Sequence, residues 1–378
     1  MLKGQTPVVA ELSWPQVHAF RLSGHHLIRR APKKDLARVV GDIGGAQAQL
    51  MSAAELQIGV RVQCTVKDVR TALWKDKSLV KTWLMRGTLH LVPSKDLPIY
   101  TAAMGRFRLR NLNAWLKFTQ LTEPELTGLF TAIGEALDGR TMTREELITA
   151  VGRGRSERVQ NVLKSGWGGM LKPVARNGLL CFGPSRGQSV TFARPQQWLG
   201  SWRDLDPIEA LAEVARRYLR AYGPATKQDF ARWWGAWTGV GRDAWAALAD
   251  ELVPVSIEGR HAEMLAGDLR RISRSPGSLT LQLLPAFDPY LMGHADRDHL
   301  FDAAHRARVS RVAGWISAVV LIDGRVAATW THTVAKQTLR IAVEPFRPLP
   351  AKARPLIRAR AEEIAATLGL ARVDLSVA

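Results

Sequence analysis

The chain has 378 residues, 46% of them hydrophobic, which is the composition of a folded protein with room for two or three domains. No apolar run approaches the roughly 20 residues of a membrane-spanning helix, and the first residues lack the apolar core of a signal peptide, so we expect no membrane protein and no cleaved leader. Basic residues outnumber acidic ones by 53 to 34, and the net charge of +19 favours a polyanionic partner, either nucleic acid or an anionic membrane surface.

The pattern of residues 13–92 predicts three or four short helices followed by a β-hairpin. The predicted helix N-caps are Ser13, Ser52 and Thr65. Ser52 would form a capping box with Glu55, three residues later. The hairpin VKTWLMRGTLHLV would turn at Arg86-Gly87. Helices followed by a two-stranded wing are the order of a winged helix, a variant of the helix-turn-helix motif.

The same order of helices and hairpin recurs twice along the chain. An Arg-rich linking helix from Asp96 to Phe118 leads to further helices and to a hairpin with GPSRG as its tip. More helices then precede a hairpin that turns at Glu258-Gly259. The tail differs, because a hairpin around Asp323-Gly324 is followed by a strand, a helix and a last strand.

We therefore predict an α+β, mainly helical fold with three tandem winged-helix units and a small C-terminal α+β unit. The predicted domains are residues 1–95, 96–205, 206–300 and 301–378.

Neither cysteine nor histidine chemistry stands out in the sequence. The only cysteines, Cys64 and Cys181, are far apart in apolar surroundings, so we expect two buried thiols rather than a disulfide. The stretch HADRDHLF, residues 294–301, carries two His and two Asp but lacks a Cys pair or an HExxH helix. We therefore expect no metal site and no cofactor.

The positive charge is concentrated at the start of the chain. Residues 1–120 hold 19 Lys/Arg against 7 Asp/Glu, whereas residues 121–205 carry a net +3 and residues 206–378 a net +4. A generally basic proteome would not explain this unevenness, so we predict phosphate contacts. The candidate DNA-contacting residues are Lys67, Arg70, Lys75, Lys77, Arg86, Arg153, Arg155, His294 and Arg297.

Alternatives remain open for several of these residues. The face that carries Lys67, Arg70 and Lys75 is otherwise a solvated surface with Trp74 in the core. His294 and Arg297 either touch DNA or brace the third predicted unit.

Two glutamines, Gln47 and Gln49, follow the pair Gly44-Gly45 in the loop before a predicted helix. In an extended segment, residues two apart point to the same face, so both amides could project into one site while Ala48 faces the core. An amide cannot act as a general base near pH 7, but it can hold and aim a water molecule. That role suits a reaction whose leaving group is already activated, such as guanine carrying an alkyl group and positive charge at N7. Solvated loop glutamines are the competing explanation for the spacing.

The stretch IGGAQAQLMSAAELQIGVR, together with the hairpin WLMRGTLHLVP, resembles the winged-helix DNA glycosylases of the AlkZ type. LLPAFDPYLMGHADRDHLF resembles a second signature of the same superfamily, and the resemblance covers essentially the whole chain. It implies three tandem winged helices that form a C-shaped, basic concave face. The catalytic motif of the family, Gln–hydrophobic–Gln, matches Gln47, Ala48 and Gln49, whereas the related YcaQ type has Asp in the third position.

The resemblance implies a monofunctional DNA glycosylase that hydrolyses the N-glycosidic bond of bulky or cross-linking N7-alkylguanine adducts. Gln47 and Gln49 would position the water, and no cofactor would be needed. The protein would be a cytoplasmic, nucleoid-associated monomer that acts on double-stranded DNA in repair or in self-resistance to a genotoxic natural product.

Two other classes of function remain alternatives. One is a non-catalytic winged-helix protein, either a transcription regulator or a lesion binder; a regulator would usually be a dimer. The other is a membrane-surface protein, which the lack of a basic amphipathic helix with a broad apolar face disfavours.

Overall fold

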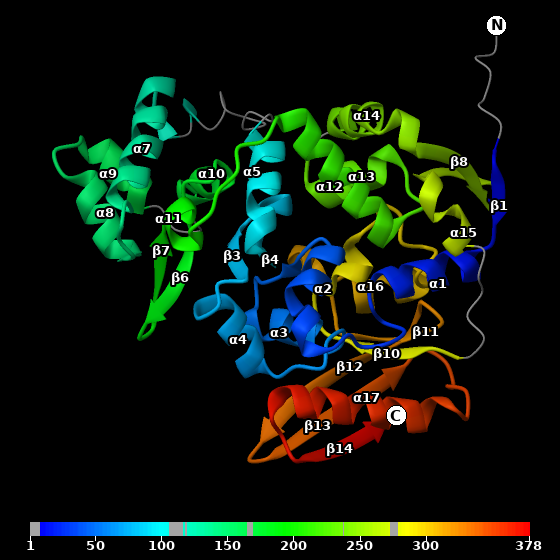
Figure 1. Cartoon of the computed structure of the whole chain (residues 1–378). Coiled ribbons are helices and arrows are strands. Elements are labelled where there is room, and N and C mark those ends of the chain that lie inside the picture. Colours follow the sequence, from blue (N-terminus) through cyan, green and yellow to red (C-terminus); the bar gives the residue numbers. More distant parts are fainter. Residues whose placement is uncertain (1–7, 106–115, 118, 165–168, 237, 273–278) are drawn as a thin grey trace, which may run out of the picture. The chain divides into compact units, whose positions relative to one another are not determined.

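The computed structural model describes residues 8–105, 116–117, 119–164, 169–236, 238–272 and 279–378 (Figure 1). The chain divides into two compact units. The first unit consists of Met1–Arg70 and Ala215–Ala378, and the second unit is Thr71–Val214. Among the described residues, no helix is both long enough and apolar enough to span a bilayer.

The N-terminal helices begin close to where their caps were predicted, with one exception. The helices are α1 (Trp14–Gly24), α2 (Leu36–Asp42), α3 (Met51–Gly59) and α4 (Val66–Trp74). The backbone N–H of Ser13 donates to Gln16 Oε1 at 2.9 Å, and that of Thr65 donates to Asp68 Oδ2 at 2.9 Å, so both predicted caps are confirmed.

The predicted capping box of Ser52 and Glu55 is wrong. Helix α3 begins at Met51 with Leu50 as its N-cap, so Ser52 lies inside the helix. Glu55 is buried and its Oε1 accepts from Arg70 Nε at 2.8 Å. The capping box would have required the carboxylate of Glu55, which instead forms a tertiary ion pair with Arg70.

The first unit contains a three-stranded sheet in the order β1-β8-β9. Its strands are β1 (Ala10–Leu12), β8 (Leu252–Ile257) and β9 (Arg260–Leu265). The predicted turn at Glu258-Gly259 is confirmed, with φ values of 47° and 83° that belong to a tight hairpin. Three helices precede this hairpin, as predicted: α12 (Pro207–Tyr222), α13 (Lys227–Trp234) and α14 (Thr238–Ala247).

A five-stranded sheet closes the first unit, in the order β10-β11-β12-β13-β14. The strands are β10 (Leu281–Leu284), β11 (Val319–Ile322), β12 (Arg325–Ala335), β13 (Thr338–Pro345) and β14 (Arg372–Val377). The predicted hairpin at Asp323-Gly324 is confirmed, and β14 pairs in parallel with β13 because α17 (Ala353–Leu368) lies between them in the chain.

Helix α17 packs on this sheet and also against α3 (Figure 1). Their shared core includes Leu56 of α3, Ile357 and Ile364 of α17, and Ile341 of β13. A Cβ at Gly59 would lie 2.3 Å from Thr367 Cγ2, so a glycine is needed for this approach. The C-terminal sheet thereby supports the helix that follows the glutamine pair. Short helices α15 (Leu269–Ile272) and α16 (Arg306–Val309) complete the unit.

The second unit begins with the predicted hairpin, formed by antiparallel β3 (Leu79–Trp83) and β4 (Leu89–Pro93). Its tip is confirmed, since Arg86 and Gly87 have φ values of 57° and 67°. Helix α5 (Leu97–Gly105) is the start of the predicted linking helix, and residues 106–115 and 118 of that prediction lie outside the described residues.

The rest of the second unit again places helices before a hairpin. The helices before the hairpin are α7 (Glu123–Ala136), α8 (Arg144–Gly152), α9 (Glu157–Lys164) and α10 (Leu171–Arg176), and α11 (Pro195–Leu199) follows it. The strands are β5 (Met142–Thr143), β6 (Cys181–Arg186) and β7 (Ser189–Ala193). The predicted tip GPSRG is wrong in extent, because β6 continues through a bulge to Arg186, which pairs with Ser189.

Both cysteines are buried free thiols, as predicted. Burial raises the pKa of each of them to about 12.

Candidate active site

The glycine pair turns the chain sharply at the end of α2. Gly44 and Gly45 have φ values of 72° and 98°, a region that side chains disfavour. A Cβ at Gly44 would lie 2.8 Å from Trp233 Cζ2 on α13. Backbone strain and lack of space together require glycine at position 44. The turn sets the direction of the glutamine segment that follows.

The prediction of an extended segment is confirmed for Ala46 and Gln47, which form the short strand β2 (Ala46–Gln47), whereas Gln49 lies in a bend. Ala48 is fully buried, which was also predicted. The two glutamines differ in environment: Gln47 is only 5% exposed, whereas Gln49 is exposed. Gln47 Oε1 is buried and has no hydrogen-bond partner among the described residues.

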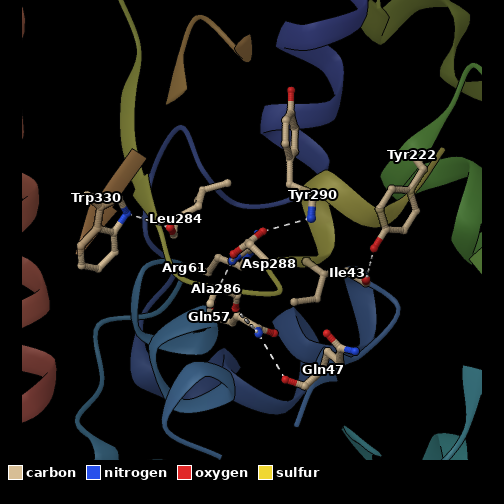
Figure 2. Close-up of polar contacts among 10 residues, drawn as sticks. All are labelled: Ile43, Gln47, Gln57, Arg61, Tyr222, Leu284, Ala286, Asp288, Tyr290 and Trp330. Atoms are coloured by element: carbon tan, nitrogen blue, oxygen red, sulfur yellow. Dashed lines mark hydrogen bonds and ion pairs between the residues drawn. The ribbon is translucent and has the colours of Figure 1, made fainter. Parts of the chain in front are cut away.

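Gln57 holds the backbone of Gln47 in place. Its Nε2 donates to the carbonyl oxygen of Gln47 at 3.2 Å and to that of Ala286 at 3.3 Å (Figure 2). The two stretches that carry the family resemblance therefore meet at this one amide. Gln57 was not predicted as a site residue, although it is a polar residue within the apolar sequence of α3.

A buried ion pair locks the same two stretches together. Arg61 and Asp288 are both fully buried and form a bidentate pair with N–O distances of 2.8 and 2.7 Å (Figure 2). Arg61 Nη1 also donates to the carbonyl oxygen of Gln57 at 2.8 Å. Asp288 caps the following turn by accepting from the backbone N–H of Tyr290 at 3.0 Å. Neither member of this pair was predicted to be important.

The other side of the glycine turn is held by aromatic and histidine side chains. Tyr222 donates its hydroxyl proton to the carbonyl oxygen of Ile43 at 2.9 Å. His25 packs edge-on between the rings of Tyr222 and Tyr290, at centroid distances of 4.7 and 5.3 Å. Burial, reinforced by Arg61, holds the pKa of His25 well below its usual value, so this imidazole is neutral.

Every carboxylate in the two stretches that resemble the family has a basic partner, as does Asp42 directly before the first stretch. The pairs are Asp42 with His26 and Arg38, Glu55 with Arg70, Asp288 with Arg61, Asp296 with Arg260, and Asp298 with Arg306. These stretches therefore offer buried amides rather than an uncommitted carboxylate.

The predicted DNA-contacting residues are spread over both units. Lys67, Arg70, Lys75 and Arg153 are exposed. Four others are half-buried and have specific neighbours. Lys77 Nζ lies 4.1 Å from the ring centre of Trp198, and Arg86 Nη2 lies 3.3 Å from His90 Nε2. Arg155 Nε donates to the carbonyl oxygen of Val151 at 2.9 Å. Arg297 Nη1 donates to Ser310 Oγ at 2.9 Å.

His294 is buried, and its Nε2 donates to the carbonyl oxygen of Tyr222 at 2.9 Å. Burial, followed by the charge of Arg21, holds its pKa well below the usual value. A buried neutral imidazole bound to α12 favours the bracing alternative over contact with DNA. His294 thus stabilises the helix whose Tyr222 supports the glycine turn.

No group of three His, Cys, Asp or Glu side chains in the described part of the chain could hold a metal ion. In the stretch after Gly293, both aspartates face arginines rather than the histidines.

Known proteins resemble this chain in sequence and in structure. A sequence model described as DNA glycosylase AlkZ-like matches residues 40–367. A protein of Streptomyces sahachiroi named interstrand DNA cross-link repair glycosylase is 36% identical over 375 residues, which are 97% of this chain and 99% of that protein. The solved structure of the Streptomyces sahachiroi DNA glycosylase AlkZ matches with a TM-score of 0.86 at 34% identity, covering 97% of this chain and all of that one.

These matches span both units and the glutamine segment, and they agree with the mixed α/β fold described above. The chain therefore belongs to the AlkZ-like family of DNA glycosylases, enzymes that hydrolyse N-glycosidic bonds in DNA.

Proposed function

We propose that this protein is a monofunctional glycosylase that releases bulky or cross-linked N7-alkylguanine from duplex DNA, with Gln47 and Gln49 positioning the attacking water. The observation that carries the proposal is the buried Oε1 of Gln47, which has no hydrogen-bond partner in the described part of the chain, next to an exposed Gln49. The name of the Streptomyces relative, which refers to interstrand cross-links, supports the substrate class.

In this reaction the main task of the protein is to align a water molecule with C1′ of the deoxyribose. Water attacks C1′ of the deoxyribose, and the C1′–N9 bond breaks as its electron pair passes to the base. That pair neutralises the positive charge that alkylation placed on the guanine, so no acid has to protonate the leaving group. Gln47 Oε1 accepts a hydrogen bond from the water, and the water's proton leaves to solvent after attack.

The paired carboxylates of the site agree with this chemistry. Asp42, Glu55 and Asp288 are each bound to a basic side chain, so none is available as a strong base. A cationic leaving group lowers the demand for such a base, and two amides are then sufficient to aim the nucleophile.

We further propose that the helix-then-hairpin segments are three winged helices that form a C-shaped basic face in a monomer. Lys67 and Arg70 on α4 and Arg86 at the tip of the β3–β4 hairpin would contact phosphates. A base cross-linked to the opposite strand cannot rotate freely into a deep pocket. An exposed Gln49 suits a site that meets such a base within the duplex.

The test is incubation of the protein with a duplex that contains N7-methylguanine and with one that contains an N7-linked interstrand cross-link. We expect free modified base and an intact strand with an abasic site, in the presence of EDTA. Binding without base release from either duplex would contradict the proposed activity, and strand cleavage would contradict the monofunctional assignment.

A further inference from the structure

Gln57 on α3 contacts the backbone of the glutamine segment through a fixed amide. Its side chain is fully buried, although it is a polar residue between Leu56 and Ile58. Its Nε2 carries two hydrogens and donates them to the carbonyl oxygens of Gln47 and Ala286 (Figure 2). These two bonds determine the orientation of the amide, because a half-turn would place its Oε1 against two carbonyl oxygens.

The side-chain oxygen of Gln57 is in the same situation as that of Gln47. Both Oε1 atoms are buried, and neither has a hydrogen-bond partner within the part of the chain that the structure covers. In Figure 2 the Oε1 of Gln57 is directed toward the side chain of Gln47. Two acceptors cannot bond to each other, and a buried acceptor without a donor is costly.

Water is the ligand that fits such a pair of oxygens. It has two hydrogens, so one molecule can donate to both oxygens at once. Ala46 and Ala48, on either side of Gln47, are fully buried and have no polar side chain that could donate instead. A water bound in this way has both hydrogens engaged, and its lone pairs point away from the two amides.

We propose that Gln57 is a further catalytic residue and that the attacking water donates one hydrogen to Gln47 Oε1 and the other to Gln57 Oε1. The inference rests on the proposed glycosylase function and adds a second buried contact to the same water. With both hydrogens held, a lone pair of the water is directed at C1′ of the deoxyribose. Gln49 contributes from the exposed side of the segment.

The two hydrogen bonds strengthen as the reaction proceeds. While the water oxygen bonds to C1′, the C1′–N9 electron pair passes to the alkylated guanine and positive charge develops on the water. The hydrogens of the water become stronger donors, so two fixed carbonyl oxygens stabilise the transition state more than the ground state. An amide cannot keep the proton, which passes to solvent once the C1′–O bond has formed.

Methanol as a competing nucleophile tests this contact on a duplex containing N7-methylguanine. Methanol has one O–H hydrogen and can donate to only one of the two oxygens, so the wild type should favour water. Gln57→Met keeps a similar volume and leaves one acceptor, so water loses this advantage. The share of strands that carry a methyl deoxyriboside instead of an abasic site should rise about 5-fold, the worth of one net hydrogen bond. Mass spectrometry of the strand distinguishes the two products.

The product ratio separates a catalytic contact from a structural one. Loss of the bonds made by Gln57 Nε2 would slow attack by water and by methanol equally, and the ratio would not change. Tyr222→Phe is the matched control, because it removes the hydrogen bond to the carbonyl oxygen of Ile43 and loosens the same segment but leaves both Oε1 atoms in place. Its ratio should equal that of the wild type, whereas a wild-type ratio for Gln57→Met would overturn the inference.

A crystal structure of the wild type gives a readout that does not depend on catalysis. We expect one water within about 2.6–3.0 Å of both Oε1 atoms. A direct bond from Gln47 Nε2 to Gln57 Oε1, or the lack of a shared water, would overturn the inference even if Gln57→Met does not fold. If the wild type releases no N7-methylguanine, the proposed function fails, and the crystal structure still shows whether the two oxygens share a water.

Discussion

Gln47 combines a restrained backbone with an unsatisfied side-chain oxygen. Its carbonyl oxygen is bound by Gln57, and its Oε1 is buried without a partner among the described residues. Leaving a buried acceptor unpaired costs about 1–3 kcal/mol, so its retention fits a group reserved for a ligand. Gln49, in contrast, is exposed. The two amides therefore lie in different environments.

Replacing Gln47 with Leu separates stability from activity. The variant removes an unpaired buried acceptor and keeps a similar volume, so we expect the Tm to stay the same or rise. Base release under single-turnover conditions should fall on the order of 10²-fold, the usual loss for one group that orients a reacting atom. Gln57→Leu is the control, because it removes two hydrogen bonds and should lower the Tm. A lower Tm for Gln47→Leu would show that its Oε1 has a structural role.

Gln49→Asp converts the motif to the pattern of the related YcaQ type. A carboxylate can still accept from a water molecule, so we expect measurable base release that exceeds that of Gln49→Ala. The measurement is the single-turnover rate for both variants on one N7-methylguanine duplex. Equal rates for Asp and Ala would mean that the side chain of Gln49 acts by donating a hydrogen bond.

At the scale of elements, the site depends on contacts between segments that are distant in sequence. Arg61 and Asp288 are 227 residues apart and form a fully buried ion pair. Tyr222 of α12 binds the turn after α2, and α17 supports α3 from the C-terminal sheet. The glutamine segment is short and has little regular structure, so these neighbours define its geometry.

Breaking the buried ion pair should be costly. Asp288→Asn leaves the Arg61 charge buried without its counter-charge, which should lower the free energy of unfolding by about 3–5 kcal/mol. Asp296→Asn is the control, since its pair with Arg260 is exposed and such pairs contribute about 0–1 kcal/mol. Urea denaturation of both variants measures the difference. Equal losses would show that water or a shifted side chain compensates for the buried charge.

Gly44→Ala tests the turn that precedes the site. The alanine would be strained at φ 72° and would press on Trp233, so we expect both a lower Tm and slower base release as β2 is displaced. Gly369→Ala has a similar φ of 71° but open space around it, and it should lower the Tm without affecting the chemistry. Unchanged base release by Gly44→Ala would show that the turn does not set the position of Gln47.

Local sequence signals correctly predicted the caps and turns that are stabilised by residues close to them in the chain. The caps at Ser13 and Thr65 and the turns at Arg86-Gly87 and Glu258-Gly259 depend on neighbouring residues alone. Strands β1 and β10 were missed because they are short and are stabilised by pairing with distant strands. The predicted cap at Ser52 is wrong because the carboxylate of Glu55 accepts a hydrogen bond from Arg70 instead of from the backbone at Ser52.

The candidate site was only partly predictable. The extended backbone at Gln47 was predicted from the glycines and the spacing of the amides, whereas the bend at Gln49 was not. Gln57, Arg61 and Tyr222 did not, because nothing in the sequence indicates that their partners come from α2, β2 and the loop at Asp288. The burial of Gln47 and the exposure of Gln49 could not be predicted either, because both depend on tertiary packing.

At the scale of the whole molecule, the net charge of +19 has a direct consequence for binding. Affinity for unmodified duplex DNA should fall steeply with salt, because each neutralised phosphate releases counterions. A titration at several salt concentrations should give a clearly negative log–log slope. Lys75→Ala should reduce the slope and weaken binding to all sequences alike, whereas Lys336→Ala, at an exposed turn between β12 and β13, should not. A flat slope would contradict an electrostatic mode of binding.

A cluster of buried histidines makes the first unit sensitive to acid. Burial is the main cause that lowers the pKa of His18, His25, His294 and His299, and for His18 the pKa is about 3. Their pKa in the unfolded chain is about 6.5, so the unfolded state binds protons first as the pH falls. Stability is fully present above that value and is lost below it, by up to about 1.4 kcal/mol per pH unit for each group.

Urea unfolding at pH 7.5 and pH 5.5 measures this loss. His25→Phe keeps an aromatic ring between Tyr222 and Tyr290 but removes one titrating group, so its stability should depend less steeply on pH. An identical pH dependence for the variant and the wild type would show that His25 is not part of the acid response.

The most direct test of the account is the double variant Gln47→Ala/Gln49→Ala on a duplex containing N7-methylguanine. The amides act on the transition state, so the single-turnover rate of base release should fall by about 10²-fold or more while the Kd for the duplex changes little. Gln63→Ala, an exposed glutamine of the same unit, should match the wild type. Release of modified guanine by the double variant at the wild-type rate would show that Gln47 and Gln49 do not position the water.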